Sequence, residues 1–412
     1  MNIVKNRIFP CVVGLGYVGL PVFTRLQKKF TTVGFDINKT RITTLKKKID
    51  INKEFNSKEL KLINNSYLSH NEKDISDCNF YIVTVPTPLK KNNTPDLKPL
   101  FKASQLISKN LKKGDIVVFE STVYPGTSEI LIRNYFEKNK EFKEGKNFWV
   151  GYSPERVNPG DKIHSIDKTA KILAFNTKST KVRKKFIKIY KSITSKLHIT
   201  NSIKDAETAK VIENIQRDLN IALMNDIYLF SKKMKLNYEN IIKLASTKWN
   251  FLKFSPGLVG GHCLPVDPYY LYYIAKKNNI FLKTVLAGRQ VNSSMEGFIF
   301  NEIKKKIIRI KKIKKKPCIL ISGITYKNNV ADIRNSLPLK IFLNLKKIFK
   351  NINAYDYMCD DSTAKKYNIL KKLEKKSNYD LIVFLVNHKK NKKIYDYAKK
   401  NKINIFDPFK FY

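Results

Sequence analysis

Three glycines near the amino terminus place the strongest constraint on the fold of this chain. The apolar segment Cys11–Leu15 predicts a β-strand, and it leads into the pattern GxGxxG at residues 14–19. Where such a pattern joins a strand to a helix, its glycines allow a tight turn, the close approach of a pyrophosphate and close helix–strand packing. The amino terminus of the helix then faces the phosphates of a dinucleotide. The alternative is a purely structural turn.

Asp36 favours the dinucleotide interpretation. It ends the next predicted strand, Thr32–Asp36, 17 positions after Gly19 (36 − 19). A carboxylate at that place can hold the ribose hydroxyls of NAD and repels the additional phosphate of NADP. We therefore expect NAD as the cofactor.

The first half of the chain alternates short apolar runs with helical segments such as Leu100–Leu111 and Ser128–Lys138. The further strands that this pattern predicts are Phe80–Val85, Ile116–Glu120, Phe148–Tyr152 and Lys171–Phe175. Alternation of this kind is typical of a parallel, doubly wound sheet.

The middle of the chain is predicted to be helical. A helix is expected over Asp205–Lys233, and helical sequence continues to about residue 310 around a glycine-rich loop at Phe254–Pro268. Alternation then returns, with strands expected at Pro317–Ser322, Asn351–Tyr355, Leu381–Val386 and Ile403–Phe406. The sequence thus predicts an α/β protein with two Rossmann-like, doubly wound parallel-sheet domains, joined by a long central helix and a helical middle domain.

Composition excludes several classes of protein. Of the 412 residues 42% are hydrophobic, which fits a globular chain. The formal net charge of +46 is spread along the sequence without a distinct basic patch, so we expect no nucleic-acid partner. The five cysteines form no CxxC pair and the five histidines lack metal-ligand spacing, so we expect no metal. In the absence of a signal peptide and of a membrane-spanning apolar run, we expect a cytoplasmic protein without a membrane partner.

Cys263 lies in the segment GLVGGHCLPVDP at residues 257–268. The glycines let the backbone approach a ligand closely, and the carboxylate of Asp267 follows the thiol by four positions. A nucleophilic cysteine needs exposure and surroundings that favour the thiolate. Free cysteines are also common as inert core residues, so this segment alone leaves both interpretations open.

Polar residues follow several predicted strands, at the sheet edge where open α/β sheets bind ligands. These segments are Thr84–Pro88, Glu120–Gly126, Ser153–Gly160, Gly323–Lys327 and Asp332–Ser336. Such residues also populate turns for local reasons, and Glu155 beside Arg156 can be a surface ion pair. On the long helix, Lys210, Asn214 and Arg217 share one stripe. That stripe either faces solvent or forms an oxyanion site.

Taken together, these segments resemble the UDP-glucose/GDP-mannose dehydrogenase family of nucleotide-sugar 6-dehydrogenases. The resemblance spans nearly the whole chain, with the motifs in the family's order: GLGYVG, VPTP, ESTVYPGT, SPERVNPGD, AKVIENIQRDLNIALMND, GLVGGHCLPVDP and GITYKNNVADIRNS. A series of seven motifs is far more specific than any single one. Within the family, SPERVNPGDKIHSIDK and ENIQRDLNIA resemble the branch that acts on UDP-N-acetylhexosamines.

The resemblance implies a four-electron oxidation of the C6 alcohol of a UDP-sugar to a carboxylate, with two NAD per turnover. The product would be a precursor of surface polysaccharide. In this chemistry Cys263 adds to the C6 aldehyde and gives a thiohemiacetal, which loses hydride to become a thioester that water cleaves.

Five further residues match the family's catalytic positions. Lys210 and Asn214 would stabilise the developing oxyanion. Asp267 and Thr122 would hold water and manage protons, and Glu155 would assist hydrolysis of the thioester.

The resemblance also implies binding residues, domains and assembly. Contacts with NAD are implied for Gly14, Gly16, Tyr17, Val18, Gly19, Asp36, Arg41, Thr87, Thr122 and Arg334. Contacts with the UDP-sugar are implied for Glu155, Arg156, Val157, Lys210, Asn214, Arg217, Phe254, Gly257, Gly260 and Lys327, and for Arg289, which the family supplies to a neighbouring subunit. The implied domains are an NAD-binding Rossmann domain (1–198), a central helical dimerisation domain with the cysteine loop (199–300) and a UDP-sugar-binding Rossmann-like domain (301–412). The long helix would form the interface of a homodimer or higher homo-oligomer.

Three alternatives remain open from the sequence. Leu264-Pro265 replaces the Ile-Gly common in the N-acetylhexosamine branch and resembles the UDP-glucose branch, which makes a UDP-glucose 6-dehydrogenase the closest alternative. A dinucleotide-binding protein that has lost catalysis is a different class, and the presence of all six catalytic residues argues against it. A nucleic-acid-binding protein is supported by charge alone.

Overall fold

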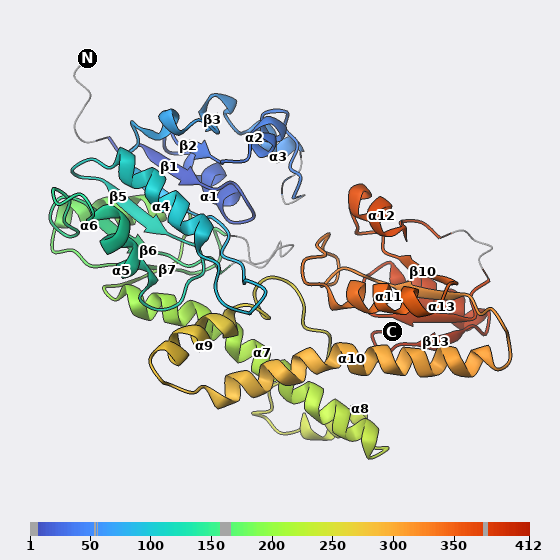
Figure 1. The fold of residues 1–412 in the computed structure, drawn as a ribbon. Helices are drawn as coiled ribbons and strands as arrows, with labels where there is room; N and C mark the ends of the chain where they lie inside the picture. Colours follow the sequence, from blue (N-terminus) through green and yellow to red (C-terminus); the bar gives the residue numbers. More distant parts are fainter. Residues whose placement is uncertain (1–6, 53–54, 56, 157–165, 374–377) are drawn as a thin grey trace. The chain divides into compact units, whose positions relative to one another are not determined.

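The computed structural model describes residues 7–52, 55, 57–156, 166–373 and 378–412. They form two compact units (Figure 1). Unit 1 comprises the described residues up to 213 together with 269–280, and unit 2 comprises 214–268 together with the described residues from 281 onward. Val157, one of the residues predicted to bind the substrate, lies outside the described residues.

Unit 1 is built on an eight-stranded sheet in the order β3-β2-β1-β4-β5-β6-β7-β8. Its strands are β1 (Pro10–Val13), β2 (Val33–Phe35), β3 (Leu68–Ser69), β4 (Phe80–Val83), β5 (Ile116–Phe119), β6 (Trp149–Tyr152), β7 (Lys171–Phe175) and β8 (Leu197–Thr200). Strands β1, β4 and β5 are buried apolar runs, as expected where helices cover both faces of a parallel sheet. Neighbouring strands are parallel except β6 and β7, where Gly151 pairs with Phe175 in antiparallel register.

Short helices follow most of these strands. They are α1 (Gly19–Leu26), α2 (Lys39–Lys46), α3 (Ser57–Lys61), α4 (Lys98–Asn110), α5 (Thr127–Leu131) and α6 (Thr180–Tyr190), with helical turns η1 (Asn65–Tyr67), η2 (Glu72–Ile75) and η3 (Ile132–Phe136). Phe186 of α6 stacks on Phe175 of β7, with ring centroids 4.4 Å apart. This aromatic contact holds α6 against β7.

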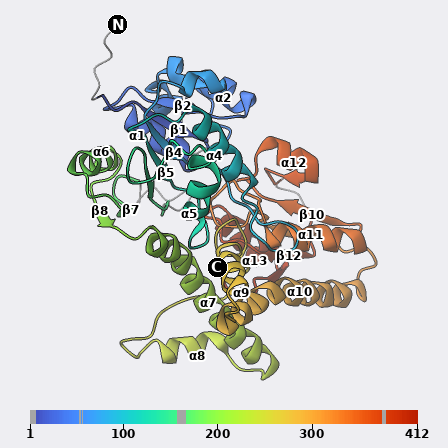
Figure 2. The same cartoon turned by 60° about the vertical axis from the view of Figure 1, so that its left-hand side comes forward.

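Two long helices, α7 (Ile203–Lys233) and α10 (Lys283–Lys311), carry the middle of the chain, and α8 (Tyr238–Ala245) and α9 (Asp267–Lys277) lie between them in sequence (Figures 1 and 2). Within unit 2, α7 and α10 are in close contact at Gly288, because a Cβ there would lie 2.4 Å from Leu219 Cδ2. Asn225 of α7 also donates a hydrogen bond to Asn292 of α10 at 2.8 Å.

Unit 2 contains a parallel five-stranded sheet in the order β11-β10-β9-β12-β13. Its strands are β9 (Ile319–Ser322), β10 (Ile352–Tyr355), β11 (Ile369–Leu370), β12 (Leu381–Phe384) and β13 (Asn404–Phe406), with helices α11 (Leu337–Ile348), α12 (Asp361–Tyr367) and α13 (Asn391–Lys400). Ile299, Ile303 and Ile307 of α10 belong to the core beside this sheet. Their four-residue spacing gives α10 one apolar face.

The predicted α/β class with two parallel sheets is confirmed, and the ends of the expected strands differ from the observed ends by at most two residues. Three short strands, β3, β8 and β11, were not predicted. The helix expected at Ser128–Lys138 is α5 followed by the π-helical turn η3. The antiparallel pair β6–β7 is a departure from the all-parallel expectation.

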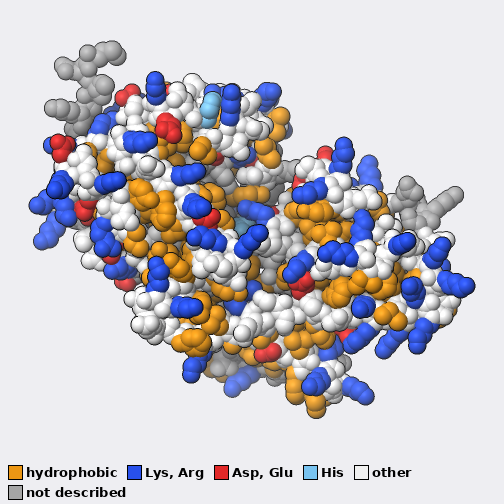
Figure 3. All heavy atoms as spheres, viewed as in Figure 1, with side chains coloured by type: hydrophobic (Ala, Val, Ile, Leu, Met, Phe, Trp, Pro, Cys, Tyr) orange, Lys and Arg blue, Asp and Glu red, His pale blue; other side chains and the backbone are white. Residues whose placement is uncertain are grey.

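Lysine and arginine side chains are spread over the visible face of both units and do not gather in one place (Figure 3). This distribution is the one expected from a charge excess that runs through the whole sequence.

Candidate active site

The glycine turn after β1 has the geometry of a dinucleotide-binding loop. Gly14 has a φ of +97°, and a Cβ on Gly19 would lie 1.8 Å from the Gly14 carbonyl oxygen, so neither position tolerates a side chain. A Cβ on Gly16 would meet no atom within 4 Å, which leaves space beside that residue. Val18 is the N-cap of α1, and Tyr17 precedes it in the same turn. The turn therefore fits a bound pyrophosphate at the start of α1.

Asp36 lies directly against this turn. Its Oδ2 accepts a hydrogen bond from the Leu15 N–H at 2.8 Å, and its Oδ1 accepts one from the Asn38 N–H at 2.8 Å. A carboxylate oxygen has two lone pairs, so acceptor capacity remains for ribose hydroxyls. These residues fit NAD.

Arg41 supports the glycine turn from inside unit 1. Its Nε donates to the Leu15 carbonyl at 2.8 Å, and its Nη1 forms a buried ion pair with Asp50 at 2.6 Å. Its Nη2 has no hydrogen-bond partner among the described residues. These contacts give the Arg41 side chain a structural role within unit 1. Its predicted contact with NAD stays a prediction.

Hydroxyl groups join the loops that follow β1, β4 and β5. Thr84 donates to the Gly14 carbonyl at 2.6 Å, Ser121 to the Val85 carbonyl at 2.7 Å, and Thr87 to the Thr122 carbonyl at 2.7 Å. These bonds bring Thr87 and Thr122 to the same sheet edge as the glycine turn. This edge is where open parallel sheets bind ligands.

Glu155, which follows β6, belongs to a buried charge cluster. Lys171 Nζ donates to Glu155 Oε2 at 3.1 Å and to Glu120 Oε2 at 3.0 Å, and the Tyr190 hydroxyl donates to Glu120 Oε1 at 2.8 Å. Burial acts against the Lys171 ammonium, but the attraction of the two carboxylates outweighs it and raises the lysine pKa. Burial also raises the pKa of Glu120, despite Lys171.

Arg156 and Lys210 are two further residues of unit 1 that the sequence predicts for the site. Arg156 donates from Nη1 to the Ala170 carbonyl at 3.0 Å and pairs through Nη2 with Glu213 of α7 at 2.7 Å. Lys210 lies on α7, one helical turn before Asn214. The helix thus places an ammonium and an amide on one stripe, as predicted.

In unit 2, α7 is bound directly to the segment that follows Cys263. Asn214 Nδ2 donates to Asp267 Oδ2 at 2.5 Å, and Arg217 Nη2 donates to Asn214 Oδ1 at 2.9 Å. The Asp267 N–H donates to the Cys263 carbonyl at 2.9 Å. Cys263 is half-buried, and its Sγ lies 3.1 Å from His262 Nδ1. The structure therefore brings together three of the predicted catalytic residues: Cys263, Asn214 and Asp267.

The glycines before Cys263 are needed for close packing within unit 2. A Cβ on Gly260 would lie 2.7 Å from the Asn335 carbonyl oxygen, and one on Gly261 would lie 2.6 Å from the Tyr326 ring. Gly257 exchanges two hydrogen bonds with the Asn225 side chain, at 2.8 and 3.1 Å. Phe254 lies three residues before Gly257 and is half-buried. The cysteine loop is thereby fixed both to α7 and to the loop after β9.

Arg289 of α10 is buried and forms an ion pair with Asp218 at 2.6 Å, and Asn292 also donates to this carboxylate at 2.8 Å. Burial raises the pKa of Asp218 in spite of the nearby arginine. Arg289 therefore has a partner within its own unit, and its predicted role toward a neighbouring subunit stays a prediction.

The loop after β9 is held by a buried pair that sequence reasoning did not single out. Asp356 Oδ2 accepts hydrogen bonds from the Ile324 and Thr325 N–H groups at 2.8 and 3.0 Å, and it lies 3.0 Å from His388 Nε2. Burial alone would raise the pKa of Asp356, but these donors lower it. Lys327 follows in this loop and is half-buried.

Arg334 pairs with Asp332, two residues earlier, at 2.6 Å, and its side chain is 47% exposed. The Arg334 Nε also donates to both Asp332 oxygens, at 3.0 and 3.1 Å, and the Asp332 carboxylate is buried, so the pair orients the guanidinium within this loop. Its predicted contact with NAD stays a prediction.

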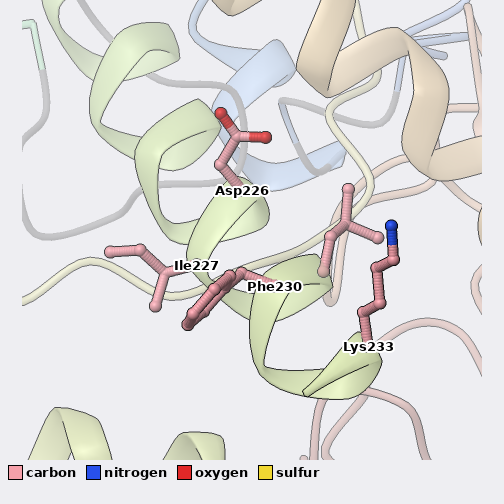
Figure 4. Close-up of a pocket in the computed structure, with 5 residues that line it drawn as sticks. Asp226, Ile227, Phe230 and Lys233 are labelled. Atoms are coloured by element: carbon pink, nitrogen blue, oxygen red, sulfur yellow. The ribbon is translucent and has the colours of Figure 1, made fainter.

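An open hollow on α7 is lined by Asp226, Ile227, Leu229, Phe230 and Lys233 (Figure 4). None of these residues belongs to the predicted site. Among the described residues, no group of three or more His, Cys, Asp or Glu is placed to hold a metal ion, and no helix is long and apolar enough to span a bilayer.

Comparison with known proteins now identifies the family. Three models of the UDP-glucose/GDP-mannose dehydrogenase family match the chain in order: the NAD binding domain at residues 8–194, the central domain at 204–294 and the UDP binding domain at 320–411. Protein CapL of Staphylococcus aureus is 41% identical over 402 residues, which is 96% of this chain and 94% of CapL. The chain belongs to the UDP-glucose/GDP-mannose dehydrogenase family.

Further relatives of this dehydrogenase support the assignment. A UDP-N-acetyl-D-glucosamine 6-dehydrogenase of Pseudomonas aeruginosa is 43% identical over 346 residues, covering 84% of this chain and 82% of the relative. The solved structure of the UDP-D-ManNAc dehydrogenase from Pyrococcus horikoshii is similar with a TM-score of 0.85 at 27% identity, covering 98% of this chain and 96% of that chain. The protein is thus an oxidoreductase of the nucleotide-sugar dehydrogenase class, with an NAD-binding domain and a UDP-binding domain.

Proposed function

We propose that this dehydrogenase oxidises the C6 hydroxyl of a UDP-N-acetylhexosamine to the carboxylate, as a step toward surface polysaccharide precursors. Relatives from Pseudomonas aeruginosa and Salmonella typhi named UDP-N-acetyl-D-glucosamine 6-dehydrogenase support this substrate class, at 43% and 39% identity. A UDP-N-acetyl-D-mannosamine dehydrogenase of Methanocaldococcus jannaschii is 32% identical. The higher identities favour the glucosamine over the mannosamine epimer.

The observation that carries the proposal is the set of contacts joining the Cys263 loop to Asn214 and Asp267. A half-buried thiol beside an oriented amide and a carboxylate is suited to covalent capture of an aldehyde. An inert core cysteine needs neither neighbour.

The reaction then proceeds on the sulfur of Cys263. NAD supplies a hydride acceptor for each of the two oxidations. The Cys263 thiolate adds to the C6 aldehyde, so that a C–S bond forms and the carbonyl oxygen becomes an alkoxide. Loss of hydride from C6 leaves a thioester. Water attacks the thioester carbon, a C–O bond forms, and the C–S electron pair leaves with sulfur.

The side-chain amide of Asn214 is oriented so that it can donate a hydrogen bond to the alkoxide. Its Oδ1 is occupied by Arg217 and one Nδ2 proton by Asp267, so the amide is held in one orientation with a second Nδ2 proton left to donate. Lys210, one turn earlier, adds positive charge on the same stripe. Groups fixed in this way stabilise a developing oxyanion without reorganising.

The proposal is tested with the purified protein, NAD and a panel of UDP-GlcNAc, UDP-GalNAc, UDP-ManNAc and UDP-glucose. NADH is measured by absorbance and the product by mass spectrometry. The expected result is turnover of an N-acetylhexosamine with two NADH per uronate. Much faster turnover of UDP-glucose would contradict it.

UDP-glucose 6-dehydrogenase is the second candidate, because Leu264-Pro265 after the cysteine resembles that branch. We also propose that the protein is a homodimer or higher homo-oligomer that contacts its copies through α7, and that the three family segments act as separate domains. Sedimentation or mass photometry of the purified protein tests the assembly.

A further inference from the structure

The sheet of unit 2 places one loop at the point where its strand order reverses. Strands β9, β10 and β11 follow one another toward one edge, and the chain then crosses to β12 and β13 on the other side of β9. Open parallel sheets bind ligands outside the strand carboxyl ends at such a point. The loop that leaves β9 there, residues 323–329, contains Lys327, and the UDP binding domain of the family matches residues 320–411. A nucleotide bound to unit 2 is therefore expected to lie against this loop.

His388 is a fully buried residue that contacts the 323–329 loop at two separated positions. Its Nδ1 accepts a hydrogen bond from the Asn329 N–H at 2.9 Å, and its Nε2 lies 3.2 Å from the Thr325 hydroxyl. Lys327 lies between these two positions, and its carbonyl accepts from the same Thr325 hydroxyl at 3.1 Å. The backbone on both sides of Lys327 is thus joined to one imidazole ring.

The bond to Asn329 assigns the proton of this ring. Because Nδ1 accepts from a backbone N–H, the neutral imidazole carries its proton on Nε2. Nε2 then donates to Asp356 Oδ2 at 3.0 Å, the same oxygen that accepts from the Ile324 and Thr325 N–H groups. Nε2 therefore contacts the carboxylate that holds the start of the loop, and Nδ1 holds its end.

The two ends of the loop depend on His388 to different degrees. Asp356 accepts from three backbone N–H groups besides the ring, so the start of the loop keeps its acceptor without the imidazole. The Asn329 N–H has Nδ1 of His388 as its acceptor, and a half-buried N–H that loses its acceptor costs free energy. Loss of Nδ1 is therefore expected to displace the end of the loop and leave its start in place.

We propose that His388 is a positioning residue for nucleotide binding, whose Nδ1 holds Asn329 and so keeps Lys327 in place for the diphosphate of the UDP-sugar. The proposal rests on the proposed function for the identity of the ligand. A lysine ammonium binds phosphate oxygens as a point charge, so its contribution to affinity depends on its distance from them. The quantity that His388 sets is the affinity for the UDP part of the substrate.

The test uses His388→Gln in the full-length protein. The Gln amide nitrogen reaches the place of Nε2 and can still donate to Asp356, but no acceptor remains at the place of Nδ1 for the Asn329 N–H. Calorimetric titration with UDP alone is expected to show about tenfold weaker binding. KM for UDP-GlcNAc should rise by a similar factor, while kcat and KM for NAD stay within about threefold of the wild type.

His388→Asn is the matched variant, because an Asn amide oxygen takes the place of Nδ1 and can accept from Asn329. Its affinity for UDP should stay within about threefold of the wild type. Ile382→Val in β12 controls for stability. Ile382 is buried in a core cluster of unit 2, so this change should lower the thermal midpoint and leave the affinity for UDP unchanged.

An H388Q variant that folds, as judged by circular dichroism, and binds UDP as tightly as the wild type would overturn the proposal. An H388N variant weakened as much as H388Q would do the same, as would a loss of kcat at unchanged KM. If H388Q fails to fold, Tyr357→Phe tests the same end of the loop, because the Tyr357 hydroxyl donates to Asn329 Oδ1 at 2.9 Å. UDP binding should then weaken about threefold, and unchanged binding would refute the role of this loop end.

UDP binding and turnover separate this proposal from the proposed function. A wild type that binds UDP but produces no NADH from any UDP-sugar refutes the proposed function alone. Turnover of UDP-GlcNAc with unchanged UDP affinity in H388Q refutes only the role of His388. A wild type that binds no UDP refutes both.

Discussion

At the scale of single residues, the half-buried thiol of Cys263 has a ring nitrogen 3.1 Å away and a backbone carbonyl that accepts the Asp267 N–H. Cys318, at the entrance to β9, is also half-buried, and burial raises its pKa. The two cysteines share an intermediate exposure but differ in their neighbours. This pair allows the nucleophile to be tested with a matched control.

Cys263→Ser is expected to lower overall oxidation by about 1,000-fold or more, because a serine hydroxyl is a far weaker nucleophile than a thiolate. NAD binding, measured by fluorescence or calorimetry, should remain within about twofold of the wild type. Cys318→Ser should retain near wild-type turnover. Unchanged turnover in C263S would exclude a covalent role for the sulfur.

Some residues of the site could be predicted from the sequence and others could not. The resemblance indicated Cys263, Asn214 and Asp267, which the structure connects. The sequence pattern does not indicate the Lys171 cluster, because Lys171 begins a strand and its two carboxylate partners, Glu120 and Glu155, follow other strands. Asn225 and the Asp356–His388 pair were missed for the same reason, since long-range partners leave no local pattern.

At the scale of elements, the start of α1 depends on close packing of its first residue, Gly19, against the turn that precedes the helix. Gly19→Ala would place a methyl group 1.8 Å from the Gly14 carbonyl oxygen. We expect a loss of stability of about 3 kcal/mol and a large loss of NAD affinity, because the turn must shift. Denaturant unfolding and NAD titration measure both.

The control for Gly19 is Gly297→Ala in α10. This glycine is exposed and a Cβ there would meet no atom within 4 Å. Alanine is the better helix former, so the change should stabilise the protein by about 0.5–1 kcal/mol. Equal effects of the two substitutions would contradict the steric argument.

The start of α5 is joined to α7 by Glu207. Its carboxylate accepts from the Gly126 N–H at 2.6 Å and from the Ser128 N–H at 2.9 Å, and burial raises its pKa to about 7. Between pH 4.5 and about 7 the unfolded chain loses a proton that the native state keeps. The contribution of this group to stability therefore falls as pH rises through that window and is constant above it.

Glu207→Gln removes this titration. The stability of the wild type relative to E207Q is expected to decline by on the order of 3 kcal/mol from pH 4.5 to above pH 7. Urea unfolding at several pH values measures it. Asp396→Asn on α13, with a side chain that is 58% exposed, is the control and should change the free energy of unfolding by less than about 1 kcal/mol.

Elements were predictable where their pattern was strong. The buried apolar runs of β1, β4 and β5 and the uninterrupted helix α7 were expected close to their observed bounds. Strand β8 was not, because its residues are half-buried or exposed and it pairs on only one side. The direction of β7 depends on its pairing with β6, which no property of its own sequence specifies.

At the scale of the whole molecule, the net charge of +46 is spread along the sequence, and lysine and arginine do not gather in one place on the face that Figure 3 shows. Both NAD and a UDP-sugar are anionic, so a general positive field should speed their encounter with the protein. We expect kcat/KM for the UDP-sugar to fall severalfold between low and physiological salt while kcat is unchanged. Steady-state kinetics over a sodium chloride series measure this, and a parallel fall in kcat would contradict it.

The chain leaves unit 1 within α7 and returns to it for residues 269–280. In that returning segment Tyr270 donates to the Thr87 carbonyl at 2.7 Å, and the Tyr273 ring lies 5.2 Å from that of Tyr124. During synthesis, a nascent chain of about 200 residues therefore still lacks contacts that support the loop after β4. These contacts of unit 1 can form only once residues 269–280 have been synthesised.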